Sequence, residues 1–496
     1  MGKLLVGIDL GTTSTKVTLF DPERGQLGSG SEPVPLYSDE PGWSEADTRV
    51  WWDNVCRLIP AVASDSGVAA SSISGVAVSG MVPAIVLLDA VGRVLRRAIL
   101  QNDARAVSEI GELNRALEDV GYDVLEHTGS ALTQQSIAPT WQWLIRYEPD
   151  VASRTATLVG SYDWLAISLG ASRQVEANWA LESGLYEISG APAEPVRAKA
   201  GIADALLPVP LAPGSFAGAV SGTAAEATSL RPGTPIYVGG ADHVLAAYAA
   251  GLSRPGDWLV KLGGAGDILV VTDKPAVDWR WYLDAHPAPG LWLPNGCMAT
   301  SGSLLRWMQQ LVGGVALEEL DKEANDADPA SLICLPYFLG EKSPLHDPDL
   351  RGCFIGLHLG HRRGDLFRAC MEAVAYGFRN HVDVFGERGI VLGDGRVSNG
   401  GSGSYVWKQI LADVLNAELT SIADDGGAAL GAALVAAVGS RAIGSWESGE
   451  ERVRLGEVIQ PRPEYAAAYD QGYEMYLDVQ RIVTPVSHRL AARGRS

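Results

Sequence analysis

Residues 7–21 read GIDLGTTSTKVTLFD: an apolar run ends at Asp9, a short polar turn follows, and a second apolar run ends at Asp21. The turn begins with Gly11 and continues with four hydroxyl residues. Two apolar runs on either side of a glycine turn predict a β-hairpin. Backbone N–H groups in such a turn can hold a phosphate, although no helix follows it as in the usual phosphate-binding loops. An ordinary exposed hairpin has the same pattern, so the stretch alone leaves both interpretations open.

A second stretch repeats this scheme half a chain later. Residues 257–273 read DWLVKLGGAGDILVVTD, and Leu262-Gly263 falls where Leu10-Gly11 falls in the first stretch. Glycine hairpins resemble one another by chance, so the echo alone does not establish a duplication. A duplication would give two related lobes, each presenting a hairpin turn to the cleft between them. We then expect an N-terminal lobe over residues 1–240 and a C-terminal lobe over residues 241–496.

Composition limits the class of protein. The 496 residues are 47% hydrophobic and 20% charged, which is enough to bury two large cores, and strand-like and helix-like patterns alternate in the manner of α/β layers. The net charge of −20 argues against a nucleic-acid or membrane partner. Five scattered cysteines without a CxxC pair, and no signal-like apolar segment, predict a cytoplasmic protein with reduced thiols.

A carboxylate follows a double glycine in Gly239-Gly240-Ala241-Asp242-His243. A strand is expected before the glycines and a helix after them, so Asp242 falls at a helix N-terminus. It could simply cap that helix. It could also face a cleft and accept the proton of an attacking hydroxyl, because a helix N-terminus keeps a carboxylate ionised. Phosphoryl transfer requires little more than such an acceptor, since its transition state is loose.

Two further segments are candidates for binding. Residues 399–404 read NGGSGS between an expected strand and a helix, where glycine backbone could lie against an adenine ring or merely form a flexible connection. Trp43 lies in an expected loop and is therefore a better candidate for a ligand contact than the core tryptophans. The histidines show no metal-ligand spacing. Neither GxxxxGK[ST] nor a strict GxGxxG is present.

Taken together, these segments resemble the FGGY family of carbohydrate kinases, within the group that shares the actin, hexokinase and Hsp70 fold. The resemblance runs in order through GIDLGTTSTK, GGADHVLAAYAAG, LPYFLGEKSP and NGGSGSYVWKQILADVL, and covers nearly the whole chain. It implies an α/β protein with two related ribonuclease H-like lobes, and ATP, Mg²⁺ and a sugar bound in the central cleft.

The resemblance also implies roles for individual residues. Asp242 would be the catalytic base and would contact the sugar, while Asp9 would organise Mg²⁺. ATP would be held by Gly11, Thr12, Thr13, Gly263, Gly264, Gly400, Gly401 and Ser404. Within the family, PGWSEADTRVWW and LLDAVGRVLRRAILQNDAR are most similar to xylulokinases. That subgroup implies a sugar pocket lined by Trp43, Met81, Val82, Pro83, Asn102, Asp103 and Arg105.

Three positions depart from the family pattern. Pro83 stands where xylulokinases have a sugar-contacting histidine, Asn399 replaces a glycine, and the turn at Gly263 to Gly266 lacks the usual hydroxyls. A missing hydrogen-bonding group can change substrate preference by orders of magnitude. We therefore expect a kinase of a ketopentose such as D-xylulose, with ribulose, erythritol and ribitol as alternatives. An ATP-hydrolysing member of the fold, a non-catalytic sugar and ATP-binding regulator, and a homodimer also stay open.

Overall fold

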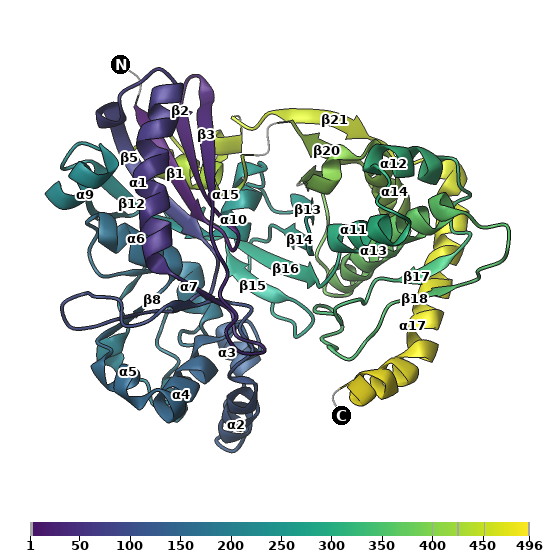
Figure 1. Cartoon of the computed structure of the whole chain (residues 1–496), viewed down its shortest axis with the longest axis horizontal. Coiled ribbons are helices and arrows are strands. Elements are labelled where there is room, and N and C mark those ends of the chain that lie inside the picture. The colour runs from purple at the N-terminus through teal and green to yellow at the C-terminus, as the bar shows by residue number, and fades with distance from the viewer. Residues whose placement is uncertain (1–2, 399, 424–425, 451, 495–496) are drawn as a thin grey trace.

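The computed structural model describes residues 3–398, 400–423, 426–450 and 452–494, which form two α/β lobes side by side (Figure 1). The N-terminal half of the chain makes the lobe on the left of that view, and most of the C-terminal half makes the lobe on the right. Among the described residues, no helix has both the length and the apolar character needed to cross a bilayer.

The N-terminal lobe is built on a six-stranded sheet with the order β11-β12-β5-β1-β2-β3. Strand β2 pairs antiparallel with both β1 and β3, whereas β5 pairs parallel with β1 and β12 pairs parallel with β5. The strands span Leu4–Leu10 (β1), Ser14–Asp21 (β2), Gly25–Pro33 (β3), Ile73–Gly80 (β5), Phe216–Ala219 (β11) and Pro235–Ala241 (β12).

The C-terminal lobe has a seven-stranded sheet with the order β15-β16-β14-β13-β19-β20-β21. Its central run β16-β14-β13-β19-β20 repeats β3-β2-β1-β5-β12 in order and in strand direction. The two hairpins that echo each other in sequence thus occupy equivalent places, and the predicted fold class is confirmed. The strands span Trp258–Leu262 (β13), Gly266–Val270 (β14), Tyr282–Ala285 (β15), Trp292–Met298 (β16), Gly395–Ser398 (β19), Leu419–Ile422 (β20) and Leu455–Ile459 (β21).

Helices cover both sheets, and short strands extend the loops. In the first half of the chain the helices are α1 Thr48–Asp65, α2 Val107–Glu118, α3 Val124–Thr128, α4 Ile137–Tyr147, α5 Pro149–Arg154, α6 Ser161–Leu169, α7 Ala177–Glu182, α8 Glu194–Ala200, α9 Gly222–Thr228 and α10 Asp242–Ala249. In the second half they are α11 Gly302–Leu311, α12 Leu317–Asn325, α13 Arg363–Glu387, α14 Tyr405–Leu415, α15 Gly427–Gly439, α16 Glu447–Glu450 and α17 Ala466–Gly494. The short strands are β4 Glu45–Ala46, β6 Val86–Leu88, β7 Ala98–Ile99, β8 Thr157–Val159, β9 Val175–Glu176, β10 Pro210–Leu211, β17 Ile333–Leu335 and β18 Cys353–Ile355.

Helix α15 returns from the second half of the chain and packs on the N-terminal sheet and on α10. Its sequence, GAALGAALVAAVG, is almost entirely small residues, which lets backbones approach closely. A Cβ added at Gly7 of β1 would overlap the Ala429 carbonyl oxygen, and one at Gly431 would overlap the Leu245 carbonyl oxygen. Helix α15 therefore packs so closely on β1 and α10 that these two contacts leave no room for an added Cβ atom.

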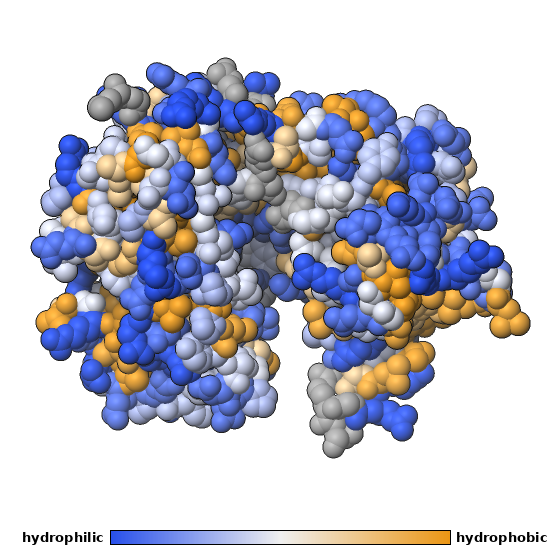
Figure 2. All heavy atoms as spheres, turned by 45° about the horizontal axis from the view of Figure 1, so that its top comes forward, coloured by the Kyte–Doolittle hydropathy of each residue, from blue (hydrophilic) through white to orange (hydrophobic). Residues whose placement is uncertain are grey.

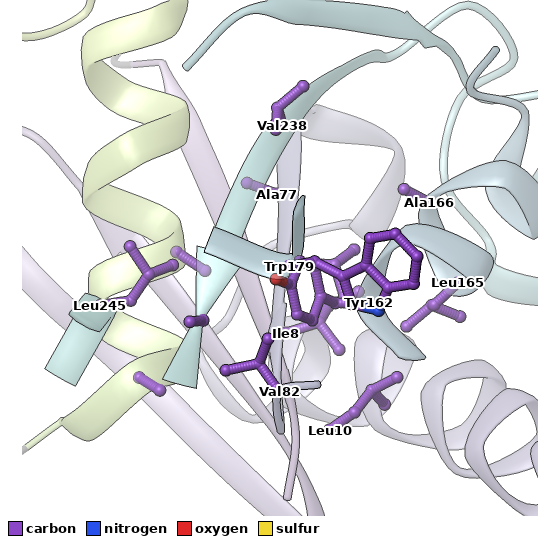
Figure 3. Close-up of a cluster of buried hydrophobic side chains, with 14 of the residues drawn as sticks. Ile8, Leu10, Ala77, Val82, Tyr162, Leu165, Ala166, Trp179, Val238 and Leu245 are labelled. Carbon is purple, nitrogen blue, oxygen red and sulfur yellow. The ribbon is translucent and has the colours of Figure 1, made fainter. Parts of the chain in front are cut away.

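A buried apolar cluster supports the same region from the other side. Figure 3 shows Ile8 and Leu10 of β1 beside Val82, Tyr162 and Trp179, all of them buried. Close packing of this kind transmits small displacements, because the interior has no free volume to absorb them. The ends of β1, β5 and β12 are therefore fixed on both faces of the sheet.

The contact between α15 and α10 gives a first prediction. Gly431→Ala places a methyl group on the Leu245 backbone and should lower the free energy of unfolding by about 1–3 kcal/mol, the usual cost of overpacking. Gly386→Ala is the matched control, because Gly386 is exposed in α13 and a Cβ there meets nothing within 4 Å. It should be neutral or stabilising by about 0.5–1 kcal/mol. Urea denaturation gives the free energy of unfolding of each variant. An equal change in both variants would contradict a tight contact between α15 and α10.

A buried histidine in the C-terminal lobe makes stability depend on pH. The His381 ring lies between the Gly377 carbonyl oxygen (2.9 Å from Nδ1) and the Ser343 hydroxyl (3.0 Å from Nε2), and burial lowers its pKa to about 4. In the unfolded chain a histidine has a pKa of about 6.5. The unfolded state therefore binds this proton first as the pH falls.

We expect the free energy of unfolding to fall as the pH is lowered from about 6.5 to about 4. His381 alone contributes up to about 3 kcal/mol over that window, at 1.36 kcal/mol per pH unit. His381→Gln should lower stability at pH 8 but make the loss on acidification shallower. Denaturant midpoints measured at several pH values test this. A wild-type protein and variant that lose stability in parallel on acidification would contradict it.

Candidate active site

The ends of three parallel strands bring the first predicted residues together. Asp9 of β1 pairs with Ser79 of β5, and Ser79 pairs with Gly240 of β12. Asp242 follows two residues later, as the first residue of α10. The two carboxylates that the sequence singled out therefore lie at one edge of one sheet. Figure 2 shows that the surface of the molecule is hollowed between its two halves.

Asp9 is buried, with 7% of its surface exposed, and its Oδ1 has no hydrogen-bond partner among the described residues. Burial, and then the charge of Asp242, raise its pKa to about 7, while Lys16 and Lys261 act in the opposite direction. A buried carboxylate oxygen without a donor, close to a second carboxylate, is a suitable environment for a divalent cation. The residues present thus fit the Mg²⁺ ion that the sequence analysis expected at Asp9.

Asp242 has a partly open carboxylate, with 36% of the side chain exposed. The N-cap position of α10 belongs to Ala241 and carries no side-chain cap. Asp242 Oδ1 accepts a hydrogen bond from the His243 backbone N–H at 2.7 Å. Among the described residues Oδ2 accepts none, so it is available to a ligand. The simple N-cap alternative for Asp242 does not apply.

The turn of the first hairpin exposes the groups expected to bind phosphate. Gly11 N–H donates to the Ser14 carbonyl oxygen at 3.0 Å, which closes the turn, and Val34 N–H donates to the Thr13 carbonyl oxygen at 2.9 Å. Thr12 is half-buried and Thr13 is exposed. The hydroxyls therefore do not belong to the core, and they border the edge where Asp9 lies.

The second hairpin turn is hydrogen-bonded to the beginning of helix α11. The Gly263 and Gly264 carbonyl oxygens accept hydrogen bonds from the backbone N–H groups of Gly302 and Ser301, at 2.7 and 2.8 Å. One rung before the turn, Lys261 pairs with Asp267, and their charged groups are 3.3 Å apart.

The first hairpin has the opposite arrangement at the same rung, with Asp9 opposite Lys16. The sequence pattern predicted only backbone groups at the second turn, and the lysines beside the two turns were not predicted. Because the Lys261 ammonium acts on the Asp9 carboxylate, the two hairpins approach each other across the cleft.

A pocket of about 390 Å³ brings together the residues expected to hold the nucleotide. Gly263, Gly264, Gly400, Gly401 and Ser404 line it, and α11, α12 and α13 contribute walls that the sequence analysis did not identify, namely Leu305, Arg306, Leu317, Glu318, Asp321, Phe367 and Met371. Its size and its mixture of apolar walls with a few polar groups are typical of a small-molecule site.

Three of the glycine-segment residues have different local roles. Gly400 is next to open space, whereas a Cβ at Gly401 would overlap the Trp407 ring, so Gly401 is also required for packing. Ser404 caps α14, because its Oγ accepts a hydrogen bond from Trp407 N–H at 3.1 Å. Asn399, one of the departures from the family pattern, lies outside the described residues.

The residues expected around the sugar form a network of their own. The Arg105 guanidinium contacts the carboxylates of Asp103 and Glu45, at 2.8 and 2.7 Å, and its Cζ lies 3.9 Å from the ring centroid of Trp43. Asn102 Oδ1 accepts a hydrogen bond from the Ser44 hydroxyl at 2.7 Å. These contacts fix the Trp43 loop, and one buried Arg105 nitrogen, Nη1, remains without a partner among the described residues.

The three residues after β5 that were expected to line the sugar pocket, Met81, Val82 and Pro83, are all buried. Met81 N–H donates to the Leu10 carbonyl oxygen at 3.1 Å, and Val82 and Pro83 then form a turn between β5 and β6.

A cluster of ionisable groups behind Asp242 was not expected. His243 Nε2 lies 2.9 Å from Asp284 Oδ2 and 4.0 Å from Glu182 Oε1. The three residues come from α10, β15 and α7, which are far apart in sequence. The absence of ligand spacing around the histidines was correct as a sequence observation, but it could not reveal this cluster.

Comparison with known proteins identifies the family. Residues 4–249 match the N-terminal domain of the FGGY family of carbohydrate kinases, and residues 263–440 match its C-terminal domain. The chain belongs to this family. It is a carbohydrate kinase with the actin-like ATPase fold, as the order of its motifs predicted.

Individual relatives are similar over their whole length. The chain is 26% identical to the xylulose kinases of Staphylococcus epidermidis RP62A and of Bacillus subtilis strain 168, in each case over 96% of both chains. The crystal structure of xylulose kinase from Rhodospirillum rubrum is 40% identical and superimposes with a TM-score of 0.91, covering 98% of this chain and 100% of that one.

Proposed function

We propose that the protein transfers the γ-phosphoryl group of ATP to a hydroxyl of a ketopentose such as D-xylulose. The observation that carries this proposal is the pair Asp9 and Asp242 at one sheet edge, between two hairpin turns. The relatives named as xylulose kinases support the choice of sugar. The buried Met81–Pro83 segment leaves ribulose, erythritol and ribitol as alternative substrates.

The chemistry assigned to each group follows from its position. Asp242 Oδ2 accepts the proton of the sugar hydroxyl while the sugar oxygen forms its bond to the γ-phosphorus and the bond to ADP breaks. The proton ends on Asp242 and leaves to solvent, and the products are the sugar phosphate and ADP. A carboxylate suffices because the proton is transferred late in a loose transition state.

The two hairpins would hold the phosphates of ATP. The first offers the backbone of Gly11 and the hydroxyls of Thr12 and Thr13, and the second offers backbone at Gly263 and Gly264 together with the positive charge of Lys261. Asp9 would hold Mg²⁺ through water, and the ion would neutralise phosphate charge. The adenosine part would enter the pocket at Gly400, Gly401 and Ser404.

Exclusion of water is required, because ATP next to a base would otherwise be hydrolysed. We propose that the two lobes close on the two substrates, with α10 and α15 moving together with the N-terminal sheet on which they pack. The Trp43 loop, fixed by Arg105, Asp103 and Asn102, would complete the sugar side of the closed site. Arg105 Nη1 is the donor that this loop leaves for a sugar oxygen.

Asp242→Asn tests the base. The amide cannot accept the proton, so kcat with D-xylulose should fall by about 10²- to 10⁴-fold. Asp470→Asn, an exposed aspartate on α17, is the control and should keep wild-type kcat. A coupled ADP assay with D-xylulose, ribulose, erythritol and ribitol gives the rates. An Asp242→Asn variant that turns over at the wild-type rate would exclude Asp242 as the proton acceptor.

Asp9→Ala tests the metal position. Because the proposed role of Asp9 concerns Mg²⁺ and ATP alone, KM for MgATP should rise at least about tenfold, the loss of one charge-assisted contact of about 1.5–3 kcal/mol. The Kd for sugar, measured by calorimetry without nucleotide, should change less than about twofold. Comparable losses for both ligands would count against this assignment.

A further inference from the structure

His243 stands between the carboxylate in the cleft and a buried carboxylate behind it. Its Nδ1 lies 3.4 Å from Asp242 Oδ1, and its Nε2 lies 2.9 Å from Asp284 Oδ2. The Asp284 side chain is fully buried, while 14% of the His243 side chain is exposed. The ring thus connects the proposed proton acceptor to the interior of the protein.

Three elements fix this arrangement. Strand β15 carries Asp284 and is held to α7 by two hydrogen bonds between Asn178 and Ala285: Nδ2 donates to the Ala285 carbonyl oxygen at 2.9 Å, and Ala285 N–H donates to Oδ1 at 2.6 Å. Helix α7 also carries Glu182, whose Oε1 is 4.0 Å from His243 Nε2. The ring therefore has little freedom to rotate away from Asp242.

The neighbours of the ring decide its charge. Nε2 faces the carboxyl groups of Asp284 and Glu182, so this nitrogen carries a hydrogen. A neutral ring would then turn the Nδ1 lone pair toward the Asp242 carboxylate, whereas an imidazolium donates to a carboxylate at both nitrogens. Burial opposes the charged ring, but Asp284, Asp242 and Glu182 outweigh it and raise the pKa of His243 well above its ordinary value.

We propose that His243 is a positioning residue for phosphoryl transfer, an imidazolium clamped by Asp284 that fixes Asp242 through Oδ1 and leaves Oδ2 for the sugar hydroxyl. This inference rests on the role proposed for Asp242. It also explains why Oδ1 of Asp242 is hydrogen-bonded to His243 while Oδ2 stays available to the sugar hydroxyl. The backbone N–H of His243 binds the same Oδ1, so both donors of one residue act on one atom.

The clamp also balances charge at the sheet edge. Asp9 and Asp242 lie close enough for Asp242 to raise the pKa of Asp9. The positive ring is a counter-charge for Asp242 and stabilises the ionised form of Asp267 on β14. It also opposes the rise that burial and Asp284 cause in the pKa of Glu182. Lys16 and Lys261 act on the Asp9 side in the same sense. The cations thus surround the two carboxylates from both lobes.

A divalent cation held by Glu182, His243 and Asp284 is the competing explanation. One ligand atom from each lies within 4.8 Å of the others, and Glu182 Oε1 and Asp284 Oδ1 have no hydrogen-bond partner among the described residues. A metal at Nε2 and an imidazolium exclude each other, because the metal would take the place of the Nε2 hydrogen. The test therefore has to distinguish the two.

The first measurement reads the protonation state of the wild-type ring, and a variant serves only to identify its signals. Nitrogen-15 NMR of the histidine rings at pH 8, with the His243 signals identified by their absence from His243→Gln, should show both ring nitrogens protonated. Metal analysis of the purified protein should find less than about 0.1 equivalent of a transition metal. An unprotonated His243 nitrogen, or a stoichiometric metal, would overturn the inference.

The second measurement separates positioning from folding. His243→Gln and Asp284→Asn should each lower kcat by about 10- to 100-fold, the range expected for a misplaced catalytic group. KM for sugar and for MgATP should stay within about threefold, because the interaction acts in the transition state. His127→Gln, which removes an exposed imidazole 3.6 Å from the Glu187 carboxylate, should keep wild-type kinetics.

The outcomes separate this inference from the proposed function. Wild-type kcat in His243→Gln together with an inactive Asp242→Asn would refute the clamp and leave the base in place. An active Asp242→Asn would refute the base, and the clamp with it. A variant that raises both KM values and leaves kcat unchanged would show that His243 serves only to shape the binding site.

Discussion

The parallel pairing of β1, β5 and β12 brings Asp9 and Asp242 to one edge of a buried sheet, and the rest of the site depends on the repulsion between these two carboxylates. Burial and mutual repulsion raise the pKa of Asp9 to about 7. The neighbouring Lys16, Lys261 and His243 supply positive charge on both sides of the pair. A site of this kind is ready to receive an additional cation and the phosphates of a nucleotide.

The same edge is mechanically constrained. Helix α15 crosses back from the second half of the chain and contacts β1 at Gly7 and α10 at Leu245, with no room for an added Cβ. The apolar cluster of Figure 3 closes the other side of the sheet. The position of Asp242 at the start of α10 therefore depends on packing contributed by both halves of the sequence. In a family whose chemistry consists mainly of positioning charges, such rigidity is directly relevant to function.

The features that the sequence could predict are those that depend on local pattern. The two hairpins, their equivalence, and the strand–glycine–Asp242–helix segment follow from residues that are adjacent in the chain. The structure places them as expected. The order of several weak motifs was sufficient to indicate the family, which the comparisons confirm.

The remaining features depend on tertiary contacts that no local pattern encodes. Glu182, His243 and Asp284 come from three separate elements, and Arg105 reaches Glu45 across sixty residues. Met81, Val82 and Pro83 were expected at the sugar from the resemblance to xylulokinases, and a motif of that kind could not predict that all three residues are buried. The walls that α11, α12 and α13 contribute to the pocket at Gly263 and Gly400 were missed for the same reason.

The central claim is that the two hairpins and Asp242 direct the γ-phosphoryl group to a sugar and not to water. It is tested most directly by following a phosphorus label from the γ-position of ATP in the presence and absence of D-xylulose. The account predicts that ADP forms only with sugar, and that the label appears on the sugar in a one-to-one ratio with ADP. ADP formation at the same rate without sugar, with the label in inorganic phosphate, would contradict it.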